Sequence, residues 1–209
     1  MSICLGLLAP LSSSHAVPVQ FAGQATVGAL QATNGFLADF LGTQPTVGDT
    51  LTFSITFDTD SIGPQQLLGP EIASYMGGVT ASSFTLNGVT LQTAPGDPAS
   101  ILVTTLDTPG VLGIPGFADG YALTAGGAAD GQGRRWAINF FFFGAQGGLA
   151  DLAAPTTLPD IAGFQAVGLG FRSFRPTGDT ETFDGFGAPL DSLAAVPAPS
   201  ALWLMLTAI

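Results

Sequence analysis

Carboxylate side chains are the most numerous groups in this sequence that could do chemistry. Asp58 and Asp60 lie two residues apart, just after an alternating apolar segment. Carboxylate oxygens at this spacing could bind a hard cation such as Ca²⁺. The same residues could instead cap a turn by accepting hydrogen bonds from backbone N–H groups. Because the longer acidic loop with a closing Glu is absent, the sequence favours the turn cap.

A pair of carboxylates could also cleave a glycosidic bond, one acting as acid and the other as base or nucleophile. No spacing singles out two partners among the available acids, which are Asp49, Asp58, Asp60, Glu71, Asp119, Asp179, Glu181 and Asp184. Other catalytic chemistries lack the necessary side chains. The sequence has no Lys, and its single Cys and single His, Cys4 and His15, both precede residue 17. After that point, a nucleophile with a His or Lys base, a His or Cys zinc site and a Schiff base are all excluded. We therefore expect no enzyme and no cofactor.

Aromatic residues offer a different possibility, a surface on which sugar rings could stack. Arg134 and Arg135 precede Trp136, and guanidinium groups beside an indole could bind a sugar or an anionic glycan. Tyr75 and Tyr121 could add stacking surfaces, which would make the protein a carbohydrate-binding module.

An alternating pattern argues that Trp136 belongs to the core instead. Trp136 begins a series with a period of two that continues through Ile138, Phe140 and Phe142, as expected for one face of a strand. The intervening Phe141 and Phe143 would then need cover on the opposite face.

The charge balance limits the partners. The chain carries 15 acidic residues against four arginines, a net charge of −11. Such a chain is repelled by phosphate backbones, so nucleic acid is excluded as a partner. Anionic lipid and acidic polysaccharide would also be repelled unless divalent cations bridged them.

Short alternating segments predict an all-β fold. In Thr50–Phe57, apolar residues alternate with hydroxyl residues, and Asn87-Gly88 between two such segments predicts a hairpin turn. No segment before Pro199 has the period of a helix. Roughly eight strands with long Gly- and Pro-rich loops predict an antiparallel β-sandwich or jelly roll. Further strands are expected at 19–30, 101–106, 121–125, 136–143, 164–171 and 181–186, with loops at 62–70, 95–100, 109–120 and 144–160.

Both ends have the composition of processing signals. An apolar segment from Ile3 to Leu11 is followed by Ser14-His15-Ala16, which predicts a signal peptide over residues 1–16. Residues 17–195 would form the domain. At the other end, the apolar run 201–209 has nine residues, whereas a membrane span needs about 20. Because a basic start is also missing, we expect the gene to continue at both ends.

The tail resembles a known sorting signal. Val196-Pro197-Ala198-Pro199, followed by Ala201-Leu202-Trp203-Leu204, is similar to the PEP-CTERM signal of Gram-negative bacteria. Residues 19–91 also resemble proteins with this tail, through Phe21-Ala22-Gly23, Val47-Gly48-Asp49 and Ser83-Phe84-Thr85-Leu86.

The resemblance implies a function in placement and not in catalysis. In that family an exosortase, a membrane transpeptidase, processes the signal during export, so Val196, Pro197 and Pro199 would form the sorting motif. The implied protein is exported through the periplasm to the cell surface or the extracellular space, with signal peptidase and exosortase as partners. The tail would contact the membrane transiently, and polysaccharide of the matrix or biofilm would be a further partner.

Overall fold

The computed structural model describes residues 18–106, 119–127, 129–130, 132–145, 147–157, 161–177 and 180–196. These residues form one connected antiparallel sheet of 12 strands. The predicted all-β antiparallel fold is confirmed, while the jelly-roll form stays a prediction. The elements are β1 (Val19–Thr26), β2 (Ala29–Gln31), α1 (Phe36–Leu41), β3 (Thr50–Phe57), the 3-10 turn η1 (Thr59–Ser61), β4 (Gln66–Gly69), β5 (Ile72–Met76), β6 (Val79–Leu86), β7 (Val89–Gln92), β8 (Ala99–Thr105), β9 (Asp119–Gly127), β10 (Arg135–Gly144), η2 (Ile161–Gly163), β11 (Ala166–Thr177) and β12 (Thr180–Ala195).

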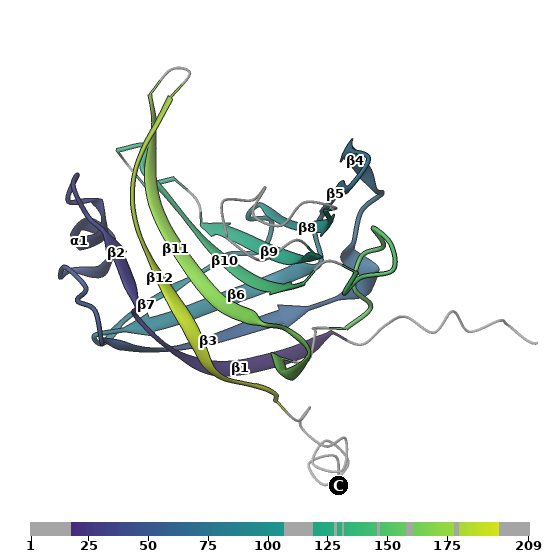
Figure 1. The fold of residues 1–209 in the computed structure, drawn as a ribbon. Helices are drawn as coiled ribbons and strands as arrows, with labels where there is room; N and C mark the ends of the chain where they lie inside the picture. The colour runs from purple at the N-terminus through teal and green to yellow at the C-terminus, as the bar shows by residue number, and fades with distance from the viewer. Residues whose placement is uncertain are drawn as a thin grey trace, which may run out of the picture.

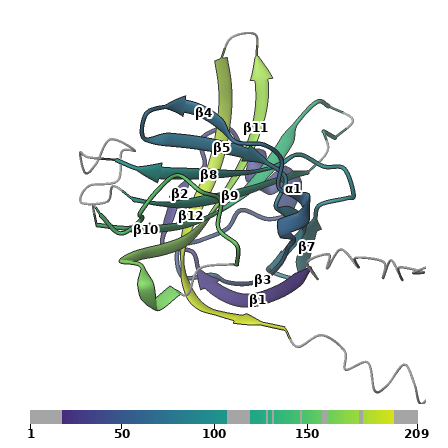
Figure 2. The ribbon, with the colours of Figure 1, turned by 90° about the vertical axis from the view of Figure 1, so that its right-hand side faces the viewer.

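The long strand β12 joins two layers of this sheet. Its first part pairs with β11 as far as Pro189, and its last part, from Leu190 to Ala195, pairs with β1. We call layer A the last part of β12 with β1, β3, β6 and β7. Layer B is the first part of β12 with β2, β4, β5 and β8 to β11. Figures 1 and 2 show β12 running from its hairpin with β11 down to β1.

Aromatic side chains fill the space between the layers. Phe84 of β6 is 1% exposed and lies against Trp136, Phe171 and Phe186 of layer B, with ring centroids 5.0 to 6.5 Å apart. Such edge-on contacts add to the stability gained from burying the apolar area. The alternation therefore places every second residue of β3, from Leu51 to Phe57, and of β10, from Trp136 to Phe142, in one shared core.

The two open sides of the core are covered by short segments. On one side Leu37 and Leu41 of α1 are buried, and α1 contacts β7, β11 and β12 (Figure 1). On the side of β5 and β9, the connection from β10 to β11 packs Leu152 and Phe164 against the core. Within the described residues, no helix has the length and apolar character needed to cross a membrane.

The predicted hairpin has the expected backbone. Asn87 and Gly88 both have positive φ, 51° and 81°, which a two-residue turn with the twist of the flanking strands requires. The strand predicted over Thr50–Phe57 is also confirmed, since it coincides with β3 and its apolar residues are the buried ones.

Other predicted boundaries were wrong. The range 62–70 was expected to be a loop, but it contains the strand β4. The strand β5 and the helix α1 were not predicted at all. The strand β4 is an edge strand in which Leu67 is 62% exposed, so burial imposes no alternation on its sequence. The strands β11 and β12 continue beyond the predicted 164–171 and 181–186, because backbone pairing extends through residues that break the apolar pattern, which include Arg172, Pro176 and Gly187.

Candidate functional site

Asp58 forms the turn cap that the sequence favours, and Asp60 takes part through its backbone N–H. Asp58 caps η1, and its Oδ1 accepts a hydrogen bond from the backbone N–H of Asp60 (3.0 Å). In the part of the chain that the structure describes, no three His, Cys, Asp or Glu residues come together as a group that could hold a metal ion.

Two of the three expected stacking residues belong to the core. Trp136 is 6% exposed and Tyr75 is 7% exposed, so neither ring has a face for a sugar. The Tyr75 hydroxyl donates to the carbonyl oxygen of Leu152 (2.5 Å). Tyr121 is half-buried against Phe164, with ring centroids 6.1 Å apart, and burial followed by the charge of Asp151 raises its pKa. The core interpretation of Trp136 is therefore confirmed.

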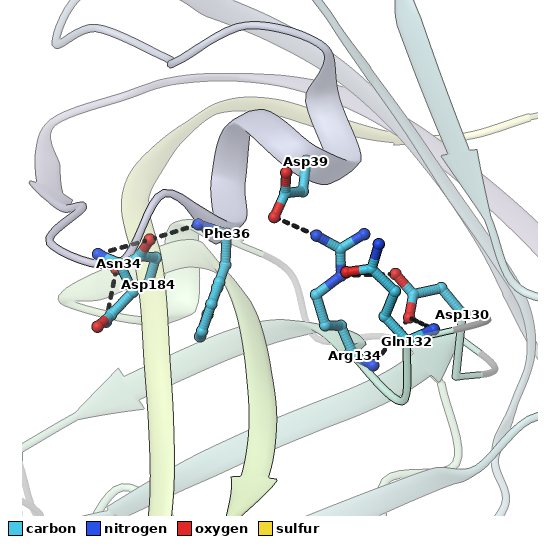
Figure 3. Close-up of polar contacts among 7 residues, drawn as sticks. All are labelled: Asn34, Phe36, Asp39, Asp130, Gln132, Arg134 and Asp184. Carbon is cyan, nitrogen blue, oxygen red and sulfur yellow. Dashed lines mark hydrogen bonds and ion pairs between the residues drawn. The ribbon is translucent and has the colours of Figure 1, made fainter.

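Arg134 forms ion pairs within the domain and does not form part of a sugar-binding surface. Its guanidinium binds the carboxylates of Asp39 in α1 and of Asp130 in the turn before β10 (Figure 3). It also lies over the ring of Phe40, 5.6 Å from the centroid. The hydrogen bond with Asp130 raises the pKa of Arg134. Burial acts to raise the pKa of Asp130, but hydrogen bonds from Arg134 and Gln132 outweigh it and lower that pKa. Arg134 thus fastens α1 to layer B.

Asp184 anchors the other end of α1. It is fully buried on β12, and its two carboxylate oxygens accept hydrogen bonds from the backbone N–H groups of Thr33, Asn34 and Phe36 at 2.8 to 3.2 Å (Figure 3). The side-chain amide of Asn34 donates to it as well. Burial acts to raise the pKa of Asp184, but these hydrogen bonds outweigh it and lower the pKa. Both oxygens of this carboxylate thus hold the chain at the start of α1.

The remaining predicted acids are dispersed. Asp49 closes a turn by accepting from Thr46 and Asn87, which lowers its pKa. Glu71 lies between β4 and β5. Asp179 lies outside the described residues, as does the side chain of Glu181, whose backbone belongs to β12.

Asp119 is buried with one oxygen unused. Its side chain is on β9, Oδ2 accepts from the backbone N–H of Leu149 (3.1 Å), and Oδ1 is buried with no hydrogen-bond partner. Phe164 and Gln165 line the same cavity, whose volume is about 310 Å³. A lone buried carboxylate oxygen costs free energy, so Asp119 is the least well satisfied acid of the described chain.

A second hollow, which we call the outer groove, lies on the face of layer B that points away from the core. Four cross-strand partners form one row across it: Asn139 of β10, Gly170 of β11, Gly187 of β12 and Ala29 of β2. Its volume is about 450 Å³, and Gln31, Arg172, Phe183 and Gly185 are among the other residues that line it.

The floor of the outer groove is open because two glycines face solvent. A Cβ atom added to Gly170 or to Gly187 would meet no atom within 4 Å. At one side, Phe183 is 36% exposed, and the guanidinium of Arg172 lies over the rings of Phe174 and Phe183, 5.0 and 5.8 Å from their centroids. Sequence reasoning missed this groove. The feature that could have indicated it is glycine at alternate positions in two segments, 168 and 170 in one and 185 and 187 in the other.

The predicted sorting motif falls at the limit of the described chain. Val196 is its last described residue, while Pro197 and Pro199 lie outside the described residues, as does the predicted signal peptide 1–16. Comparison of the chain with protein-family models, with curated proteins and with solved structures finds no match.

Proposed function

We propose that this chain is an exported, non-enzymatic protein of the cell surface or extracellular matrix, sorted by a PEP-CTERM-like signal. Signal peptidase would remove residues 1–16, and an exosortase-like enzyme would process residues 196–209 at the membrane. The protein would then function by its location, in association with exopolysaccharide or biofilm.

The observation that carries this proposal is the position of the two domain ends. Phe21 pairs with Ala195, and the backbone N–H of Val196 donates to the carbonyl oxygen of Gln20 (2.7 Å). The described domain therefore begins and ends on neighbouring strands, β1 and β12 (Figure 1). Cleavage before Val17 and after Ala195 would remove no described strand, so both signals could be processed without unfolding the domain.

The local roles of the carboxylates support a function without catalysis. Asp49, Asp58, Asp130 and Asp184 each accept backbone N–H groups within turns or at the start of α1. Their hydrogen bonds explain their positions without reference to a substrate. A glycosidase would instead need two carboxyl groups facing each other across a cleft.

A reporter fusion tests the sorting. Residues 196–209, with any codons that genomic sequencing finds in frame after Ile209, would be fused to an exported fluorescent protein. The fusion would be expressed in a bacterium that has an exosortase and in an isogenic strain without it. We expect a shorter reporter on immunoblots only where exosortase is present.

The matched control is the double substitution Pro197→Ala and Pro199→Ala in the same fusion. Proline keeps the backbone extended at and before its own position, so its loss should prevent processing. If the parent reporter keeps its full length in the exosortase strain, the sorting proposal is wrong.

A further inference from the structure

We propose that the outer groove binds an extended, uncharged glycan chain. This inference goes beyond delivery to the surface, because it assigns a ligand to the folded domain itself. It also moves the glycan site away from Trp136 and Tyr75, which are buried, to a face of layer B whose residues had no predicted role.

The first argument is that two paired glycines in the interior of this layer are open. Apart from Gly69 and Gly144, the last residues of β4 and β10, the other sheet glycines of this layer have atoms within 4 Å of an added Cβ. Neighbouring groups occupy the place of a side chain at four of them: Gly120 under Phe143, Gly127 under Trp136, Gly168 under Phe141 and Gly185 beside the carbonyl oxygen of Phe171. Gly170 and Gly187, which are cross-strand partners, have no such cover. The open pair leaves room for a ligand to approach the backbone closely.

The second argument is the direction of the groove. The row from Asn139 to Ala29 crosses four strands, a length of about 14 Å at the usual spacing between strands. A peptide that binds by adding a strand needs a sheet edge, whereas this row crosses the face of paired strands. The shape therefore fits a chain that lies across the sheet.

The third argument concerns charge and hydrogen bonding. Among the described residues that line the groove, none is Asp or Glu, so a cationic ligand finds no carboxylate there. A polyanion is opposed by the net charge of −11. The polar groups that remain suit hydroxyl groups. The hydroxyl of Thr124 donates to Asn139 Oδ1 (2.7 Å), which leaves the amide N–H groups of Asn139 to serve as donors.

The apolar side of the groove suits the C–H face of a sugar ring. Phe183 is partly exposed, and Leu30 at the β2 end is 38% exposed. Aromatic rings combined with a few oriented polar groups are typical of small-ligand sites, and the volume of about 450 Å³ lies within their range. A neutral glycan offers both the apolar face and the hydroxyl edge.

Affinity gel electrophoresis of the purified full chain tests the inference. Native gels would contain hydroxyethylcellulose or galactomannan as neutral chains and polygalacturonate as the acidic chain. We expect at least one neutral polymer to retard the protein and polygalacturonate to have no effect. Because the assay needs no export, failure of the sorting proposal would not change its result.

Substitutions locate the binding. Gly187→Val fills the floor, has space for its side chain and suits a strand, so we expect binding about tenfold weaker or worse with the fold intact. Gly69→Val, at another glycine with no atom within 4 Å of an added Cβ, is the matched control and should bind normally. Asn139→Ala provides a second loss-of-binding variant, and circular dichroism checks the fold.

Three results would overturn the inference. One is the absence of retardation by any neutral polymer, and another is retardation by polygalacturonate alone. The third is neutral-polymer binding that survives both Gly187→Val and Asn139→Ala.

Discussion

Gly127 and Trp136 are direct partners across β9 and β10, and the indole covers the glycine so closely that a Cβ atom at 127 would lie 2.2 Å from Nε1. Phe143 covers Gly120 and Phe141 covers Gly168 in the same way. A ring laid over a glycine compensates for the side chain that the strand lacks at that position. This pairing explains how a chain with 29 glycines and 16 phenylalanines forms long strands.

We expect Gly127→Ala to destabilise the protein by about 1–3 kcal/mol, because the methyl group would displace Trp136 from the core. The matched variant is Gly187→Ala, where an added Cβ meets open space. It should be neutral or stabilising by about 0.5–1 kcal/mol, since alanine restricts the unfolded chain. Urea unfolding followed by tryptophan fluorescence measures both. Equal destabilisation in the two variants would contradict the difference in cover that we describe.

Asp184→Asn should loosen α1. The carboxylate accepts several N–H groups, and an amide has only one acceptor oxygen and would point its own N–H groups at those donors. We expect a loss of about 2–3 kcal/mol in the free energy of unfolding. Hydrogen exchange should show faster opening of residues 33–41 than of β3. Unchanged protection of this segment would show that other contacts hold α1.

The pH dependence of unfolding gives a separate test of Asp184. Its folded pKa is lowered, so it lies below the unfolded value of about 3.9. The stabilisation is then fully present above the unfolded pKa and is lost as the pH falls through the folded pKa. Stability of the parent chain should fall as the pH drops below about 4. The loss should be smaller in Asp184→Asn, which carries no proton-linked group there. Parallel pH profiles for the two proteins would count against this role.

The fold class was predictable because burial produces alternation in the central strands. Residues of β3 and β10 face the core at every second position, and Asn87-Gly88 requires a hairpin. The edge strand β4 has no such constraint, and its Leu67 is largely exposed. Contacts between residues far apart in the sequence could not be predicted either. The backbone N–H groups of Thr33 and Asn34, for example, bind Asp184, about 150 residues away.

The site predictions followed residue type, which explains their mixed outcome. Trp136 and Tyr75 both have the chemistry for sugar stacking, and both are buried. The alternation that begins at Trp136 indicated its core position, whereas no strand was predicted around Tyr75. The outer groove arises from missing side chains at Gly170 and Gly187, and its existence depends on strand register. A search for reactive residue types does not detect a feature made of glycine.

Tyr75→Phe should destabilise the domain by about 1 kcal/mol, since it leaves the Leu152 carbonyl oxygen without its hydroxyl donor. The ring itself stays in the core, so the effect reports the hydrogen bond. Gln65, whose side-chain amide donates to both groups, provides the matched control as Gln65→Ala and should cost less because it is more exposed. Thermal unfolding by calorimetry measures both variants. A larger effect from Gln65→Ala would reverse this assignment.

Asp119→Asn should leave stability unchanged or raise it by about 1 kcal/mol, because it replaces a buried, unpartnered carboxylate oxygen with a neutral group. The amide oxygen can still accept from the backbone N–H of Leu149, so the connection between β10 and β11 stays attached. Asp119→Ala removes that acceptor as well and should destabilise by about 1–3 kcal/mol. The two variants therefore separate the contribution of the acceptor from that of the charge. Urea unfolding measures both variants. If Asp119→Asn lowered the free energy of unfolding as much as Asp119→Ala, the carboxylate would be stabilising. That result would contradict the cost that we assign to the buried Oδ1 without a partner.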